Sequence, residues 1–113
     1  MRVRILAAGL AATATIAIAA SPAQSNVFAS MHKTKVVNGR VCMIDHPHHR
    51  DSGAWRTKAQ AKARAIRAWE SYTQMEYGRA WSNYRIAMNK KLKCSKVSGG
   101  QTSCTLSAHP CRY

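Results

Sequence analysis

Four cysteines constrain the fold of this 113-residue chain more than any other feature. They are Cys42, Cys94, Cys104 and Cys111. An even number of cysteines in a short exported chain favours disulfides, which stabilise domains too small to bury a large core. Four cysteines allow three pairings, and the count alone does not choose among them. An export signal and the strands that carry the cysteines therefore decide whether they pair, and how.

The N-terminus has the order of a secretory signal peptide. The sequence MRVR precedes the uncharged run ILAAGLAATATIAIAA, which is shorter than the roughly 20 residues of a membrane span. Pro22 follows, and the small residues of 23–25 fit a cleavage site, although cuts after Ala20 or Ala29 are also compatible. We predict a signal peptide at residues 1–25 and an exported protein, periplasmic or secreted.

The mature chain is strongly basic. Arg2 and Arg4 leave with the signal peptide, so 16 basic residues face four acidic ones and the net charge is +12. A small domain with this charge is drawn to anionic surfaces at low salt. We predict a monomer whose partner is an anionic surface, namely lipid phosphate, acidic polysaccharide or nucleic acid. No small-molecule substrate is evident.

A long helix is predicted at about residues 58–77. Thr57 and Gln60 have the spacing of a capping box, and Gly78 stands where a helix commonly ends. Steps of about 100° per residue divide the helix into an apolar and a polar side. The apolar side is predicted to contain Ala59, Ala63, Ile66, Trp69, Thr73 and Tyr77. The polar side contains Arg56, Gln60, Arg64, Arg67, Ser71 and Gln74.

A β-hairpin is predicted from residues 91–97 and 102–108, which alternate in polarity around a glycine-rich turn. With the turn centred on Gly99, Cys94 lies opposite Cys104. Cross-strand neighbours bring their Cβ atoms to about 4.5–5.5 Å, near the range of a disulfide. We therefore predict Cys94–Cys104, which leaves Cys42–Cys111 as the second bridge.

Residues 26–56 are predicted to form an irregular lead-in to a domain at 57–113. The stretch TKVVNGRVCMI is the exception, since Asn38-Gly39 favours a tight hairpin turn between two apolar pairs. This stretch fits a short ribbon and a flexible segment equally well.

Residues 81–92 fit two structures. Trp81, Tyr84, Met88 and Leu92 have helical spacing, but alternation from Tyr84 to Met88 is typical of a strand. The pattern W…YGxxWxxYxxA…C…C…A.PC spans about residues 57–112 and resembles that of small exported bacterial proteins of unknown function. It is carried by Trp69, Tyr77, Gly78, Trp81, Tyr84, Ala87, Cys94, Cys104, Ala108, Pro110 and Cys111.

Similar sequences can carry proline directly after the tyrosine–glycine pair, which would end the helix there. The resemblance thus favours a strand at 81–87 and implies no chemistry. The predicted fold is α+β, with one amphipathic helix on a three-stranded antiparallel meander of about 81–87, 91–97 and 102–108. The alternative is a helical hairpin followed by a C-terminal β-hairpin.

Catalytic motifs are lacking in the sequence. Glu70 and Glu76 are six residues apart on the predicted helix and face different ways, which disfavours a paired-carboxylate site. There is no nucleophile elbow and no glycine-rich phosphate loop. We predict a protein that is not an enzyme.

The stretch DHPHHRD, residues 45–51, is the candidate metal site. Its histidines are His46, His48 and His49, and imidazole is a common ligand of zinc and copper(II). In an extended chain His46 and His48 point the same way across Pro47, whereas Cys42 is unavailable if it forms a disulfide. The other interpretations are a polar linker, or a charge reserve that strengthens anion binding when histidines are protonated in acid.

Basic residues form two predicted anion-binding patches, with aromatic residues interleaved. They are Arg56, Arg64 and Arg67 along the helix, and Lys90, Lys91, Lys93 and Lys96 around the first hairpin strand. The predicted function is non-catalytic binding of anionic envelope or extracellular components. The alternative is a periplasmic or secreted zinc- or copper-binding protein that uses the histidine cluster.

Overall fold

The computed structural model describes residue 9, residues 11–14 and residues 23–113. Most of the predicted signal peptide lies outside these residues. The elements are α1 (Ala23–Ser30), β1 (Thr34–Val37), β2 (Arg40–Met43), β3 (His48–Trp55), α2 (Lys58–Tyr77), β4 (Met88–Lys96), β5 (Thr102–His109), β6 (Cys111–Arg112) and the short 3-10 helices η1 (Arg79–Trp81), η2 (Tyr84–Ile86) and η3 (Ser98–Gly100). No helix in the described part of the chain is long and apolar enough to cross a membrane.

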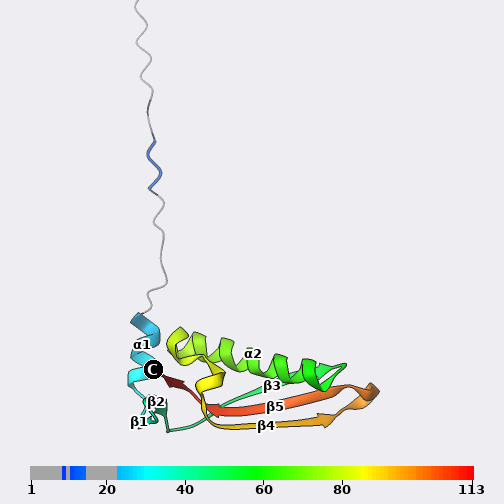
Figure 1. Ribbon diagram of the computed structural model, residues 1–113. Coiled ribbons are helices and arrows are strands. Elements are labelled where there is room, and N and C mark those ends of the chain that lie inside the picture. Colours follow the sequence, from blue (N-terminus) through cyan, green and yellow to red (C-terminus); the bar gives the residue numbers. More distant parts are fainter. Residues whose placement is uncertain (1–8, 10, 15–22) are drawn as a thin grey trace, which may run out of the picture.

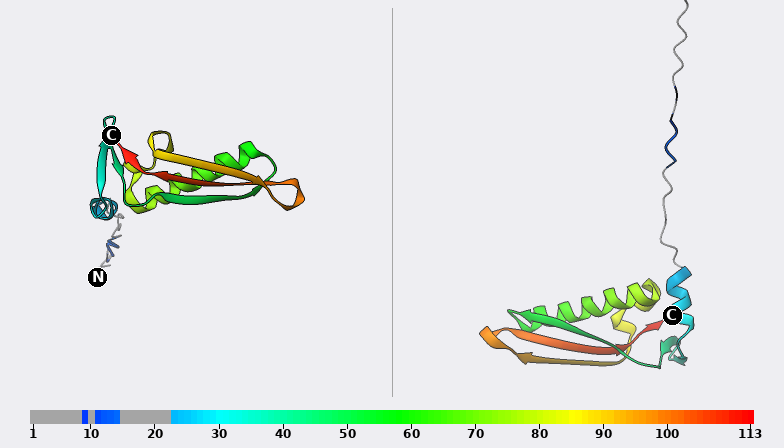
Figure 2. Two further views of the ribbon diagram at one scale, coloured as in Figure 1. Left: turned by 90° about the horizontal axis from the view of Figure 1, so that it is seen from below. Right: turned by 180° about the vertical axis from the view of Figure 1, so that it is seen from behind.

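One long helix on an antiparallel sheet makes up most of the protein, which confirms the predicted α+β fold. The sheet has the order β3-β5-β4, and α2 runs along one of its faces (Figures 1 and 2). We call α2 and this sheet the body. The body has two layers, so the other face of its sheet is left without a helix.

The start and end of α2 follow the predicted signals. The Thr57 hydroxyl accepts a hydrogen bond from the Gln60 amide at 3.1 Å, and the Gln60 side chain accepts one from the Thr57 amide at 3.2 Å. Gly78 has a φ of 100° and donates its N–H to the Gln74 carbonyl. The helix therefore spans Lys58–Tyr77, as the capping box and the glycine predict.

The third strand of the body is not the one predicted. Residues 81–87 were expected to form it, but they contain the last residue of η1 and the whole of η2, and residues 81–92 form no second α-helix either. The third strand is β3, within the region expected to be irregular. Its helix-facing positions include His48 and Arg50 instead of apolar residues, so its sequence lacks the alternation that marks a half-buried strand.

A second, smaller sheet closes one end of the protein. Its order is β1-β2-β6, and α1 lies beside it (Figure 1). We call α1 and this sheet the end unit. Asn38 and Gly39, with φ of 51° and 75°, form the turn between β1 and β2. The hairpin that the sequence allowed at this dipeptide is therefore formed, and residues 34–43 are not irregular.

Each sheet contains one cross-strand disulfide, and both predicted pairings are confirmed. Cys94 of β4 lies opposite Cys104 of β5, and Cys42 of β2 lies opposite Cys111 of β6. No free cysteine is present in the described residues. Paired cysteines of this kind are typical of proteins that fold in an oxidising compartment.

The main core lies between α2 and the body sheet. It contains Ala61, Ala65, Trp69, Ala87, Cys104, Leu106 and Ala108. Trp69 was correctly predicted to be buried, but the first half of α2 buries Ala61 and Ala65 while Ala59 and Ala63 are exposed. Alanines occur on every side of this half of the helix, so their pattern does not single out one face. A second cluster of Ala29, Met43, Tyr77 and Trp81 joins α2 to the end unit.

Candidate anion-binding surface

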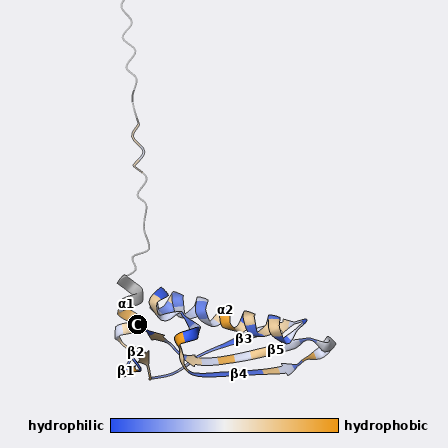
Figure 3. Ribbon diagram, viewed as in Figure 1, coloured by the Kyte–Doolittle hydropathy of each residue, from blue (hydrophilic) through white to orange (hydrophobic). Residues whose placement is uncertain are grey.

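The face of the body sheet that points away from α2, here called the outer face, is polar. Residues Cys104 and Leu106 of β5 pack against the helix and are buried, so Thr105 and Ser107 between and beyond them point outward. On β4, Leu92 faces the core while Lys91 and Lys93 are exposed. Most of β4 is hydrophilic (Figure 3). Period-two alternation thus separates a core face from a charged face.

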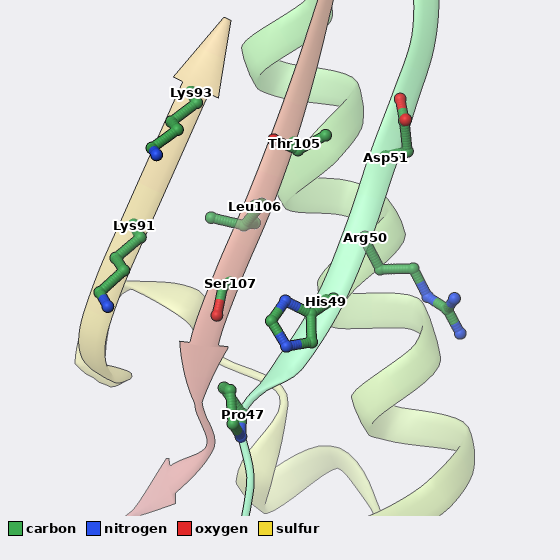
Figure 4. Close-up of a pocket in the computed structure, with 9 residues that line it drawn as sticks. All are labelled: Pro47, His49, Arg50, Asp51, Lys91, Lys93, Thr105, Leu106 and Ser107. Atoms are coloured by element: carbon green, nitrogen blue, oxygen red, sulfur yellow. The ribbon is translucent and has the colours of Figure 1, made fainter.

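Two cross-strand rows line an open hollow of about 610 Å³ on the outer face (Figure 4). The rows are His49–Ser107–Lys91 and Asp51–Thr105–Lys93. Directly opposed residues have Cβ atoms about 4.5–5.5 Å apart, so a cation and a hydroxyl lie within reach of one ligand group. A second hollow continues from Lys91 and Ser107 towards Asn89 and His109.

The charges at this hollow favour an anion. Among the described residues neither Lys91 nor Lys93 forms an ion pair. Asp51 is the acidic residue in the lining, and its Oδ1 accepts hydrogen bonds from the Gly53 amide at 2.9 Å and the Ser103 hydroxyl at 3.0 Å. Ammonium and hydroxyl donors next to each other bind phosphate, sulfate or carboxylate oxygens through charge-assisted hydrogen bonds.

Of the other predicted anion-binding residues, Lys90 lines the second hollow, and the rest lie elsewhere. Lys90 donates its Nζ to the Arg85 carbonyl at 3.0 Å, and the Arg64 guanidinium lies 4.3 Å from the centre of the Trp55 ring. Arg56 and Arg67 are exposed on the helix side, and Lys96 is exposed next to the hairpin turn. The structure therefore brings Lys91 and Lys93 to the hollow but does not join the two predicted patches.

The imidazole of His49 is the one aromatic ring of the described residues that lines the hollow. Trp69 and Trp81 are buried, with 0% and 5% of their surface exposed. Tyr72 lies beneath the Arg50 guanidinium, which is 3.6 Å from the centre of its ring. A nucleic-acid base would meet only the small His49 ring at this surface, whereas single-strand binding commonly uses several larger aromatic rings.

His48 of the predicted metal cluster is a core residue. It is 4% exposed, its Nδ1 lies 2.9 Å from the Thr73 hydroxyl, and its ring stacks on Tyr77 at 4.9 Å. Its Nε2 lies 3.4 Å from Glu76 Oε2, outside hydrogen-bond geometry, and neither atom has another partner. The Thr73 hydroxyl can donate or accept at Nδ1, whereas the Glu76 carboxylate can only accept, so the neutral imidazole is favoured with its proton on Nε2.

Burial is the main cause of an unusual pKa at His48. Loss of water lowers the pKa of its imidazole from 6.5 to about 4. The Glu76 carboxylate opposes this shift, whereas the nearby His46, Arg50 and His32 add to it. His48 is therefore neutral in mild acid, so it is not part of a charge reserve that strengthens anion binding.

The three histidines predicted as ligands are not brought together around one point. His49 points to the outer face, and His46 lies near His32, with 5.1 Å between their ring centres. His32 is itself engaged, since its Nδ1 is 2.8 Å from the Phe28 carbonyl and its Nε2 is 3.1 Å from the Tyr77 hydroxyl. In the part of the chain that the structure describes, no group of three or more His, Cys, Asp or Glu is placed to hold a metal ion.

The two contacts of His48 place a hydroxyl, a base and an acid in a row, as in a catalytic triad. The three side chains are Thr73, His48 and Glu76. A nucleophile has to meet its substrate, but Thr73 is 0% exposed and lies on the core side of α2. Burial of the Tyr77 hydroxyl next to this group raises its pKa well above the usual range. These side chains therefore form a packed polar joint between α2 and β3, not an open site.

The comparisons with known proteins yield no relative. No family model matches the chain, and no curated protein and no solved structure matches it. The assignment of a candidate anion-binding surface therefore depends on the geometry of this chain alone.

Two groups of residues escaped the sequence prediction. Thr105 and Ser107 belong to the hollow, and the stretch TSCTLSAH contained the signal, because the positions between Cys104, Leu106 and Ala108 must point outward. The contacts of His48 with Thr73 and Glu76 had no such signal. They join residues 25 and more positions apart and depend on how α2 sits on β3.

Proposed function

We propose that this protein is exported and binds anionic polymers or surfaces through the outer face of its body sheet. The observation that carries the proposal is the pair Lys91 and Lys93, which form no ion pair with any described residue and lie in a hollow beside Ser107 and Thr105. The predicted signal peptide, the formed disulfides and the charge support export and an anionic partner.

The geometry favours a repeating anion over a single small one. The hollow is open and runs along the strands, and residues two apart on one strand are about 6.8 Å apart on the same face. Lys91 and Lys93 therefore present two charges in line, which suits a polymer with regularly placed sulfate, phosphate or carboxylate groups. Since most residues that line the hollow are polar, with His49 as its one aromatic ring among the described residues, charge and hydroxyl groups provide most of the contacts.

Affinity for a heparin fragment of defined length tests the proposal. K91Q/K93Q is compared with K58Q/K62Q, which also removes two positive charges, but from exposed positions of α2. We expect K91Q/K93Q to lose about tenfold in affinity at about 0.01 M salt, where screening is weak, and K58Q/K62Q to lose far less. Equal losses of affinity in the two variants would mean that only net charge matters, and would refute specific binding at the outer face.

A further inference from the structure

Exposed large apolar side chains gather at one end of the protein. In the described residues they are Val27, Phe28, Met31, Val36, Ile44, Met75, Val97 and Tyr113. All except Val97 belong to the end unit, to the residue directly after one of its helices or strands, or to the last turns of α2 beside it (Figure 1). Val97 lies next to the hairpin turn at the opposite end. Such gathering of apolar surface marks a place of interaction.

The α1 helix divides into a buried and an apolar exposed side. Ala29 is 7% exposed and packs in the cluster with Tyr77. Val27, Phe28 and Met31 fall within about 100° of one another around the helix, on the side away from Ala29. Their exposed fractions are 57%, 53% and 73%. All three follow the predicted cleavage site after Ser25, so the mature protein keeps them.

Exposed basic residues occur in the same end of the protein. The exposed basic residues of the end unit and of η1 beside it are Lys33, Lys35, Arg79 and Arg112. The acidic residues nearby are already engaged, since Asp45 Oδ2 accepts a hydrogen bond from the Lys33 amide at 2.9 Å and Glu76 faces His48. An end unit that has both an exposed apolar helix side and exposed cations without an ion pair among the described residues is complementary to a bilayer with anionic head groups.

We propose that the end unit binds the surface of an anionic lipid bilayer, with Val27, Phe28 and Met31 entering the boundary between head groups and acyl chains. The neighbouring lysines and arginines contact the lipid phosphates. A hydrated polysaccharide offers no apolar interior to these three side chains, which is why the surface fits a lipid. This surface shares no residue with the outer face, so membrane binding and polymer binding can be tested independently of each other.

Co-sedimentation with vesicles tests the inference on the exported protein, whose N-terminus is first fixed by intact mass. The vesicles contain phosphatidylglycerol or, for comparison, only phosphatidylcholine. The test variant is V27T/F28S/M31Q, and the control is V97T at the far hairpin turn. We expect the triple variant to lose about tenfold or more in partitioning onto anionic vesicles, and V97T to bind like the unchanged protein.

Four outcomes would overturn the inference: no binding to anionic vesicles, equal binding to neutral ones, undiminished binding by the triple variant, or a mature chain that starts at Ser30 and lacks most of the apolar side. Circular dichroism and thermal unfolding of the triple variant confirm that it is folded. Failure of polymer binding is read separately, from the heparin affinity of K91Q/K93Q.

Discussion

The body and the end unit contain the same parts at different sizes. Each has one helix, one three-stranded antiparallel sheet and one disulfide between directly opposed cysteines. The body strands have 8 or 9 residues and α2 has 20, whereas the strands of the end unit have 2 to 4 residues and α1 has 8. The difference in length decides what each part leaves on its surface.

Long strands let the body hide its apolar residues on one face and place charge on the other. Leu106 and Trp69 are inside, while Lys91 and Lys93 are outside. The short elements of the end unit cannot cover all of their apolar side chains, and Phe28 and Met31 stay exposed. The two proposed activities follow from this difference, since one part offers charge to a polymer and the other offers apolar side chains to a lipid.

The disulfides give the largest expected difference between the two parts. The Cys42–Cys111 bridge closes a sequence separation of 69 residues, and the Cys94–Cys104 bridge closes one of 10. Loop entropy predicts that C42S/C111S lowers the free energy of unfolding by about 4 kcal/mol and C94S/C104S by about 3 kcal/mol. Urea unfolding of the two variants measures both values.

Hydrogen exchange locates the same effect. In C42S/C111S the amides of β1 and β2 should exchange faster while those of β5 stay protected, because the bridge secures the short strands. A larger loss of stability in C94S/C104S than in C42S/C111S would contradict this view of the end unit.

His48 gives the next largest effect, at the polar joint between α2 and β3 within the body. Its imidazole has a pKa of about 4 when folded and 6.5 as the ordinary value, so between these pH values the unfolded chain binds more protons. The free energy of unfolding should therefore fall as the pH drops from 6.5 to about 4, by on the order of 3 kcal/mol, and this contribution should level off below. Unfolding curves at several pH values in this window measure the fall.

Two glutamine variants isolate this contribution. H48Q keeps a donor and an acceptor for Glu76 and Thr73 but does not titrate, so its stability should change less with pH in this window. H49Q alters an exposed residue of the outer face and should keep the full dependence of the unchanged protein. If H48Q retained that dependence as well, another group would be responsible.

Local signals in the sequence were sufficient for much of the body. The capping box at Thr57 and the glycine at Gly78 fixed both ends of α2, and alternation around Gly99 fixed the register that pairs Cys94 with Cys104. These features depend on hydrogen bonds and side-chain directions within a few residues or across one turn. Such interactions are present in the sequence before any tertiary contact forms.

Strand β3 was missed because its stability is not local. Its inward positions are filled by His48, which bonds to Thr73, and by Arg50, which stacks on Tyr72. Polar residues become acceptable inside when distant side chains satisfy them. Non-local pairing also limited the prediction of the proposed anion-binding surface. Lys91 and Lys93 were predicted, but their neighbours on β5 and β3 depend on the order of the strands, which the local sequence does not give. The histidine cluster thus proved to be one core residue, one residue of the outer face and one exposed residue near His32.

Amide chemical-shift mapping can locate the bound anionic polymer on the protein, and we propose that it lies on the outer face. The ¹⁵N-labelled protein is titrated with a heparin-derived oligosaccharide at about 0.01 M salt, where charges are weakly screened. We predict that the largest shifts occur at His49, Lys91, Lys93, Thr105 and Ser107. Shifts that concentrate instead at Arg56, Arg64 and Arg67, on the helix side of the body, would contradict the account.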